Sequence, residues 1–326
     1  MKILVTGAAG LIASHLVDFL LEQGHIVVGV DDMSYGNIEN LKNAHQNKNF
    51  HFKKTRVQFL TLQEDKFDVI YHLASMKKPA NGIIKSVDVL KENYQMIETV
   101  VVDAVKNGSF LIFTSTSDVY GNSATFLESD AITIGPPTNE RYSYALSKLY
   151  GEQFIFNEIQ QSNLKGCVVR VFGCASWRSN KSWSGGHIPL FVDRALRGES
   201  IHIHGDGMQT RSISHALDIA YGLSKLIQHI DSVNGQIINL GTNEQTTVRA
   251  VAEYIISKTN SKSELIFDGR EQVFGNYKEI MNRFANTTKA KDLINFTINY
   301  STYQVIDEII KIYSDENSGY YSGTAH

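Results

Sequence analysis

The sequence contains few cysteines and no excess of charge, and both absences narrow what the protein can be. Its 326 residues include only two cysteines, Cys167 and Cys174, whose spacing matches no CxxC motif. We therefore expect buried thiols rather than a disulfide framework or a thiolate metal site. The net charge of −3 argues against nucleic acid and membrane surfaces as partners, since both usually require a basic face.

Long apolar runs are missing as well. No segment is long and apolar enough to span a bilayer, and polar residues such as His15 and Asp18 interrupt the apolar N-terminus, unlike a signal peptide. The histidines are scattered, and His202 and His204 have no cysteine or carboxylate at ligand spacing, so we expect no metal. We accordingly predict a soluble, cytoplasmic protein.

A glycine turn close to the N-terminus is the most informative feature that is present. The apolar run at residues 3–5 ends at Gly7, Gly10 follows, and a helical pattern begins at once with Leu11 and Ile12. Glycines permit the tight turn and the close approach of a ligand, and the start of a helix offers free N–H groups to a pyrophosphate. This strand–turn–helix context predicts a dinucleotide site, the alternative being a glycine-rich turn that binds nothing.

The second predicted strand supports the same interpretation. Residues 25–30 form an apolar run that ends in Asp31 and Asp32, about 20 residues after the last glycine, where a ribose-binding carboxylate is expected. A carboxylate accepts hydrogen bonds from the 2′-hydroxyl and repels a 2′-phosphate. The predicted cofactor is therefore NAD rather than NADP.

Strands and helices alternate through the first half of the chain. Strands are predicted at 67–75, 109–117 and 166–172, and helices at 84–107 and 142–159. This order is typical of an α/β fold with a parallel, doubly wound sheet whose ligands bind at the carboxyl ends of the strands.

The pattern changes after residue 172. A polar, Gly/Ser-rich loop covers 173–186, and helices are predicted at 187–198, 247–259 and 302–313. A short strand is predicted at 236–242. The alternating segment 201–213, with its Gly-Asp-Gly turn, predicts a small hairpin.

A tyrosine and a lysine provide the candidate chemistry. Tyr144 and Lys148 lie four residues apart and so share a helix face, while Thr116 lies at the polar end of a strand. A nearby ammonium and the positive nicotinamide ring would lower the pKa of the phenol, which could then take a hydroxyl proton as a hydride leaves the same carbon. By itself this pair is common on exposed helices; the dinucleotide turn favours function.

These segments together resemble the extended short-chain dehydrogenase/reductase family, in its sugar-nucleotide epimerase/dehydratase branch. The resemblance lies in TGAAGLIASHL, HLAS, TSTSDVYG, YSYALSK and HGDGMQTRS, and it runs from Met1 to about Leu240. It implies a Rossmann-like NAD-binding domain at 1–172 plus about 212–240. The remaining segments, 173–211 and 241–326, would form a smaller C-terminal substrate-binding lobe that holds a nucleotide diphosphate sugar.

The resemblance also assigns roles to single residues. Tyr144 and Lys148 match the catalytic pair, and Thr116 matches the residue that contacts the sugar 4-hydroxyl. The cofactor set that it implies is Gly7, Gly10, Leu11, Ile12, Asp31, Asp32, Leu73, Ala74, Ser75, Lys77, Asn93, Tyr144, Lys148 and Phe172. The implied substrate set is Thr116, Ser117, Gly173, His187 and Arg211, the last as a bidentate partner of the diphosphate, with a surface salt bridge as its alternative.

Several positions depart from the family pattern. Gly173 replaces an asparagine that normally contacts the substrate diphosphate, and residues 53–55 read Lys-Lys-Thr where an aspartate usually meets the adenine. The C-terminal arginine that binds the second phosphate has no clear match, with Arg270 and Arg283 as candidates.

Three reactions share oxidation at the sugar C4 as their first step. A 4-epimerase needs only Thr116, Tyr144 and NAD, and this reading stands slightly ahead of a dehydratase or decarboxylase that would use Asp118. Asp118 could instead cap the turn after its strand. A non-catalytic NAD-binding module is the alternative outside this class. The helices at 84–107 and 143–160 match those of the family's dimer interface, so a homodimer is expected.

Overall fold

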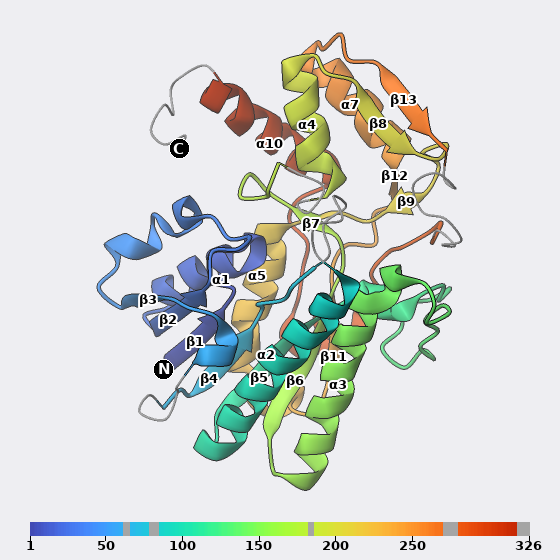
Figure 1. Ribbon diagram of the computed structural model, residues 1–326. Helices are drawn as coiled ribbons and strands as arrows, with labels where there is room; N and C mark the ends of the chain where they lie inside the picture. Colours follow the sequence, from blue (N-terminus) through green and yellow to red (C-terminus); the bar gives the residue numbers. More distant parts are fainter. Residues whose placement is uncertain (61–65, 78–84, 182–185, 270–279, 318–326) are drawn as a thin grey trace.

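The computed structural model describes residues 1–60, 66–77, 85–181, 186–269 and 280–317 (Figure 1). A parallel sheet of seven strands runs through it in the order β11-β6-β5-β4-β1-β2-β3. Its strands are β1 (Lys2–Thr6), β2 (Ile26–Asp31), β3 (Phe50–Lys54), β4 (Val69–His72), β5 (Phe110–Thr116), β6 (Lys165–Val171) and β11 (Ile237–Leu240). The chain starts in the middle and winds toward both edges, which confirms the predicted doubly wound α/β fold.

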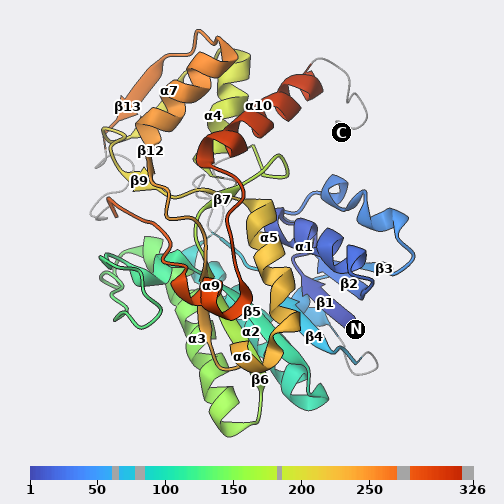
Figure 2. The same ribbon diagram turned by 180° about the vertical axis from the view of Figure 1, so that it is seen from behind.

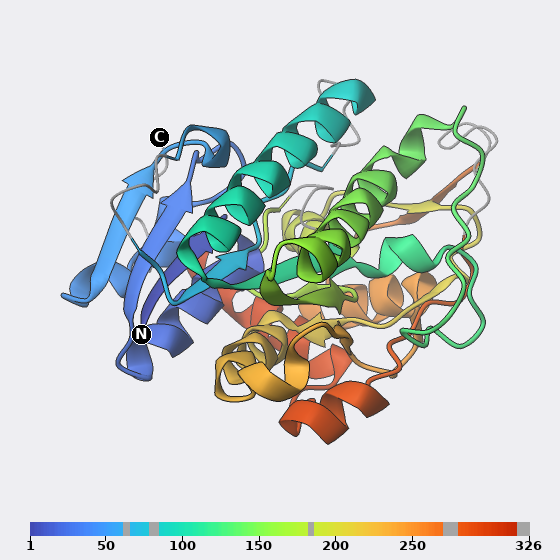
Figure 3. The same cartoon turned by 90° about the horizontal axis from the view of Figure 1, so that it is seen from below.

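Helices cover both faces of this sheet (Figure 3). The helices α1 (Leu11–Glu22) and α5 (Ala216–Lys225) bury apolar side chains such as Leu16 and Ile219 against one face. On the other face, α2 (Ser86–Asn107) and α3 (Ser143–Gln161) bury Ile97 and Ile155. Because both faces are covered, the central strands β1, β4 and β5 are buried along nearly their whole length rather than at alternate residues.

A smaller group of elements lies at one end of the sheet (Figures 1 and 2). It contains α4 (His187–Arg197), β8 (Ile201–His204), α7 (Val248–Thr259), β13 (Leu265–Asp268) and α10 (Thr302–Asn317). These elements share an apolar cluster of their own, which includes Phe191, Ile203, Ile255 and Ile306. The shorter elements are β7 (Cys174–Ala175), β9 (Thr210–Arg211), β10 (Ser214–His215), α6 (Ile230–Val233), β12 (Thr246–Thr247) and α9 (Thr288–Ile294). The exact division into two lobes stays a prediction.

The prediction of a hairpin at 201–213 is wrong. β8 pairs in parallel with β13, and β9 pairs antiparallel with β12, so the two strands on either side of the Gly-Asp-Gly turn do not pair with each other. Gly205 and Gly207 have φ values of 75° and 74°, which send the chain away from β8. The apolar Ile201 and Ile203 then pack into the cluster beneath β8. The alternation of apolar and polar residues identified β8 as a strand but did not indicate the strand with which it pairs.

Candidate functional site

The glycine turn between β1 and α1 has the shape that a dinucleotide requires. Gly7 has a φ of 70°, and a Cβ added there would lie 2.8 Å from the backbone nitrogen of Ala74. Gly10 stands at the N-cap of α1, where no side chain caps the helix and the first turn carries no acidic residue. The amides at Leu11 and Ile12 therefore begin a helix without a carboxylate, and this start fits the pyrophosphate of NAD.

The two aspartates after β2 differ in their surroundings. Asp31 is buried, and its carboxylate accepts hydrogen bonds from the amides of Ala9 at 3.0 Å and Met33 at 2.8 Å. Burial raises the pKa of Asp31, although these two hydrogen bonds oppose the rise. Asp32 is about a third exposed and lies 3.7 Å from Arg56. Asp31 thus ties the end of β2 to the glycine turn, whereas Asp32 is more exposed, and the contact of either carboxylate with the ribose stays a prediction.

The predicted catalytic pair lies on α3, next to β5. Lys148 is buried, its Nζ donates to the carbonyl of Thr114 at 2.8 Å, and it lies 6.0 Å from the centroid of the Tyr144 ring. Thr116 lies two residues further along the same strand, at its carboxyl end. The structure therefore brings the helix pair together with the end of the strand, as the spacing in the sequence predicted.

The predicted lowering of the tyrosine pKa does not occur in the protein alone. Burial raises the pKa of the Tyr144 phenol well above its ordinary value, and the nearby Asp118 carboxylate raises it further. A hydrogen bond with Ser75 lowers it in part. Burial also lowers the pKa of Lys148 to about 7, so its ammonium is itself costly to maintain. The expectation considered the charge of the lysine but not the desolvation of both groups.

Asp118 lies among three cations. It forms an ion pair with Arg283, and its side chain is about a third exposed. Burial would raise the pKa of Asp118, but Arg283, Lys77 and Arg211 together hold it below its ordinary value. The turn that follows β5 is capped instead by Thr116, whose Oγ1 accepts from the amide of Asp118 at 3.2 Å. Asp118 is thus a charged partner in the site and not the cap.

Arg283 has an ion-pair partner, Asp118, that the sequence did not indicate. It was a candidate for the second phosphate, together with Arg270, which lies outside the described residues. The carbonyl of Arg283 accepts from Ser212 at 3.1 Å, so its segment runs beside β9. Arg211 on β9 donates to the carbonyls of Thr210 at 2.7 Å and Ile280 at 2.9 Å. This backbone pairing brings residues 72 positions apart in the chain to the same cationic cluster.

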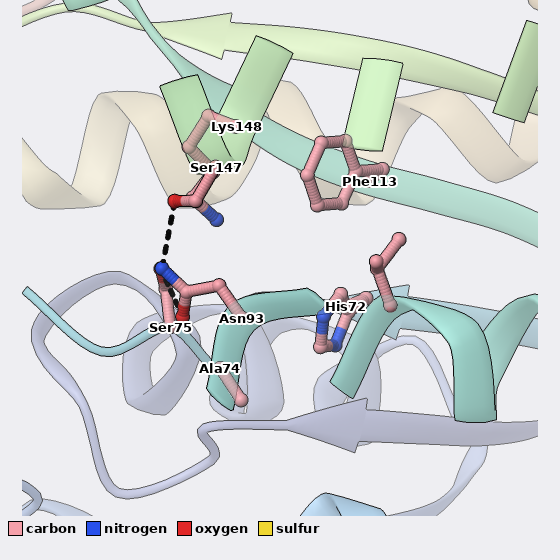
Figure 4. A pocket seen from close by; sticks show the side chains of 8 residues that line it. His72, Ala74, Ser75, Asn93, Phe113, Ser147 and Lys148 are labelled. Carbon is pink, nitrogen blue, oxygen red and sulfur yellow. Dashed lines mark hydrogen bonds between the residues drawn. The ribbon is translucent and has the colours of Figure 1, made fainter. Parts of the chain in front are cut away.

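The loop after β4 is tied to the start of α3 through Asn93 (Figure 4). The side chain of Asn93 accepts from the amide of Met76 at 2.7 Å and donates to its carbonyl at 2.9 Å. It also donates to Ser147 Oγ at 2.9 Å, and Ser147 donates to the carbonyl of Tyr144 at 2.7 Å. A cavity of about 10 Å³ lies between these groups and Lys148. Asn93 therefore holds the loop against the start of α3, and its place on the cofactor side stays a prediction.

Three further predicted residues have defined surroundings. Phe172 is 2% exposed and packs against Tyr120 and Phe126, which leaves little of its ring for a ligand. A Cβ added at Gly173 would lie 2.7 Å from the carbonyl oxygen of Ser212, so the backbone pairing of β7 with β10 leaves no room there for a side chain. His187 Nε2 is buried without a hydrogen-bond partner among the described residues, and burial together with Arg211 lowers its pKa to about 4.

A buried ion pair behind the site was not foreseen. Glu152, one turn after Lys148, accepts from Arg170 Nη2 at 2.7 Å and from the Ser115 hydroxyl at 2.5 Å. Both charged side chains are at most 3% exposed. Glu152 also opposes the fall of the Lys148 pKa. The sequence indicated only that Glu152 lies four residues after Lys148. Its partner Arg170 comes from β6, and the spacing of Glu152 does not indicate that contact.

Comparison with known proteins identifies the family. The sequence model of the NAD dependent epimerase/dehydratase family matches residues 3–241. The chain belongs to this family. Membership in the NAD dependent epimerase/dehydratase family confirms the predicted enzyme class and NAD as its cofactor. The turn at Gly7 and Gly10 fits the pyrophosphate of that cofactor, and the contact of the loop held by Asn93 with the cofactor stays a prediction.

Curated relatives within the family are similar along most of the chain. A UDP-N-acetyl-alpha-D-glucosaminuronate decarboxylase of Bacillus cytotoxicus is 30% identical over 317 residues, which cover 95% of this chain and 97% of that protein. A UDP-glucuronic acid decarboxylase 1 of Danio rerio is 30% identical over 272 residues, or 82% of this chain and 62% of that protein.

Solved structures share the fold. A UDP-glucose 4-epimerase from Thermotoga maritima superposes with a TM-score of 0.82 at 24% identity, over 97% of this chain and all of that chain. A UDP-glucuronic acid 4-epimerase from Bacillus cereus, in complex with UDP-glucuronic acid and NAD, has a TM-score of 0.81 at 24% identity, over 96% of this chain. Among the described residues, no helix is long and apolar enough to cross a membrane, and no group of three or more metal-ligating side chains is present.

Proposed function

We propose that this protein is an NAD-dependent decarboxylase of a nucleotide diphosphate uronic acid, acting through a 4-keto sugar. The supporting observation is the ion pair of Asp118 with Arg283, with Lys77 and Arg211 close enough to lower the Asp118 pKa. Three cations facing a single carboxylate leave positive charge for the anionic groups of a substrate, and a uronic acid adds one carboxylate to its diphosphate. The curated relatives of Bacillus cytotoxicus and Danio rerio described above are both named as decarboxylases of UDP-uronic acids.

The first step would be proton removal from the sugar 4-hydroxyl. Thr116, at the end of β5, would hold this hydroxyl, and the Tyr144 phenolate would take its proton. Lys148 would supply positive charge next to the phenolate. Bound NAD would accept the hydride from C4 and later return it. Because burial and Asp118 both raise the pKa of the Tyr144 phenol, the phenolate needs the positive charges of Lys148 and the bound cofactor.

The second step would break the bond between C5 and the carboxylate carbon. In a 4-keto uronic acid this bond lies next to a ketone, so its electron pair can move onto the C4 oxygen as carbon dioxide leaves. Arg283 would orient the carboxylate, and Asp118 would hold the guanidinium in place. A proton from solvent then adds to C5, the hydride would return to C4, and Tyr144 would give its proton back to the C4 oxygen.

A 4-epimerase is the second candidate. It needs the same Thr116, Tyr144 and Lys148, and it gives Asp118 and Arg283 no chemical role. A 4-epimerase acting on a uronic acid would share the cationic cluster for binding. The reaction product therefore separates the two functions.

The test is incubation of the purified holoenzyme with UDP-glucuronic acid and UDP-N-acetylglucosaminuronic acid, with UDP-glucose as the matched sugar that lacks the carboxylate. Mass spectrometry and NMR should detect loss of carbon dioxide from a uronic acid and no product from UDP-glucose. An isomer of unchanged mass would replace the proposal with a 4-epimerase, and loss of water with a dehydratase. Bound NAD without any product from these sugars would favour a binding module.

We also propose that the protein is a homodimer that pairs through α2 and α3, which lie side by side on one face (Figure 3). Apolar side chains are exposed along these helices at Val87, Leu90, Tyr94, Val102 and Tyr150. An apolar groove of about 310 Å³ runs between them, lined by Val101, Val102, Val105, Lys106, Phe154 and Glu158. Light scattering on the wild type and on a Val102→Glu variant tests the dimer by measuring the mass of each protein in solution.

We place the protein in the cytoplasm, where its two free cysteines would stay reduced.

A further inference from the structure

The loop after β4 presents Ser75 to the catalytic tyrosine from a rigid frame. On one side of Ser75, the amide of Ala74 donates to Thr6 Oγ1 at 3.2 Å, and Gly7 packs against the Ala74 backbone. On the other side, the amide and carbonyl of Met76 both bond to the Asn93 side chain. Both neighbours are held by hydrogen bonds, so the direction of the Ser75 side chain is set by the fold.

The Ser75 hydroxyl has two neighbours. It donates to Asn93 Oδ1 at 3.3 Å (Figure 4), and it lies close enough to the Tyr144 side chain to lower the pKa of that phenol. The contact with Asn93 is long, and Asn93 Oδ1 already accepts a much shorter bond of 2.7 Å from Met76. The hydroxyl hydrogen can therefore rotate from Asn93 to the tyrosine while leaving the amide oxygen satisfied.

We propose that Ser75 is a positioning residue of the redox step, and that its hydroxyl donates a hydrogen bond to the Tyr144 phenolate. While the phenol keeps its proton, Ser75 accepts from it and donates to Asn93. When the phenol transfers its proton, Ser75 turns and donates to the phenolate oxygen. This role goes beyond the cofactor contact that the family resemblance implied for Ser75.

Among the residues that the structure describes, few other protein donors face the phenolate. The groups that face Tyr144 are Asp118 after β5, Lys77 after β4, Lys148 on α3 and Cys174 on β7. Asp118 disfavours the phenolate, and the Cys174 thiol acts in the same direction. Lys148 already donates to the carbonyl of Thr114. Thr116 is assigned to the sugar hydroxyl, which leaves the Ser75 hydroxyl to donate to the phenolate.

The experiment compares S75A, S75T and S75C as NAD-loaded holoenzymes. Phenolate absorbance is titrated as the difference from the matching Y144F protein, so that the other tyrosines cancel. We expect S75A to raise the Tyr144 pKa by about one unit, which is a tenfold lower phenolate fraction at a given pH. S75T keeps the hydroxyl and should match the wild type, and S75C, a weak donor of similar size, should fall between the two.

Two results would overturn the proposal. One is an S75A titration that coincides with the wild type, whether or not the variant loses NAD. The other is an S75T titration displaced as far as that of S75A, because volume and not the hydroxyl would then be responsible. The inference rests on Tyr144 as the proton acceptor of the proposed function, but the titration needs no sugar. A protein that turns out to be a 4-epimerase would leave this result unchanged.

Discussion

Arg283 forms an ion pair with Asp118, at the carboxyl end of β5 and 165 residues away in the chain. The pair is partly exposed, with the arginine side chain 17% and the aspartate side chain 33% accessible. Exposed ion pairs stabilise a fold by only about 0–1 kcal/mol. Its larger effect is therefore on the site, where it fixes the direction of a guanidinium beside the predicted catalytic residues.

Replacing Arg283 by methionine should reduce decarboxylation by about 100- to 1,000-fold, the usual cost of losing one preorganised charge donor. The melting temperature should change little. Product formation from the preferred uronic acid, followed by mass spectrometry, checks this, with R283K as the control that keeps the charge. Full activity in R283M would remove Arg283 from the mechanism.

An Asp118→Asn enzyme with wild-type activity would show that the Asp118 carboxylate is dispensable.

The Tyr144→Phe variant should bind NAD and fail to turn over. Only the hydroxyl is removed, and the ring still fills its place in the site, so the fold and the cofactor turn stay intact. The measurements are the nucleotide released on denaturation and product formation over hours. Substantial activity in Y144F would assign the proton transfer to another group.

Lys148 should make the stability of the cofactor-free protein depend on pH. Its pKa falls from 10.5 in the unfolded chain to about 7 in the folded protein, so between these values the unfolded chain binds more protons. The free energy of unfolding should therefore rise from pH 7 to pH 10, by a few kcal/mol at most, at about 1.4 kcal/mol for each unit of pKa difference. Urea titrations of wild type and K148M at pH 7, 8 and 9 measure this rise. K148M should lack it, and equal slopes for both proteins would contradict the shifted pKa.

Gly173→Asn, which restores the residue usual in the family, should destabilise this chain. The new side chain would meet the backbone oxygen of Ser212 and the Ile213 side chain, both 2.7 Å from the added Cβ. Overpacking of this kind costs about 1–3 kcal/mol. Thermal unfolding checks it, with G173A as the control that isolates the contribution of the Cβ. An asparagine variant as stable as the wild type, with tighter substrate binding, would show that β7 and β10 separate easily.

Much of the fold could be predicted because its signals are local. The end of α2 at Asn107, the glycine turn at Gly7 and the spacing of Tyr144 and Lys148 each depend on a few neighbouring residues. The hairpin prediction failed for the opposite reason. The partner of β8 comes from β13, 64 positions later, and alternation carries no information about such a partner.

For the candidate site, too, local features could be predicted from the sequence and contacts between distant residues could not. Thr116, Tyr144 and Lys148 were predicted from their types and spacing, whereas burial raises the pKa of Tyr144 and lowers the pKa of Lys148. Desolvation depends on what surrounds a group in three dimensions, and the sequence pattern does not contain it. The family resemblance assigned Ser75 to the cofactor. Its link to Asn93 and Tyr144 follows from the packing of α2 and α3 against that loop.

The sequence by itself determined the order of strands and helices, the dinucleotide turn and the residue types available for catalysis, since periodicity and turn chemistry act over short stretches of chain. The tertiary structure alone decided which distant charges meet. Asp118 came to face Arg283, Glu152 came to face Arg170, and Gly173 lost the room for a side chain, because these outcomes depend on how whole elements pack.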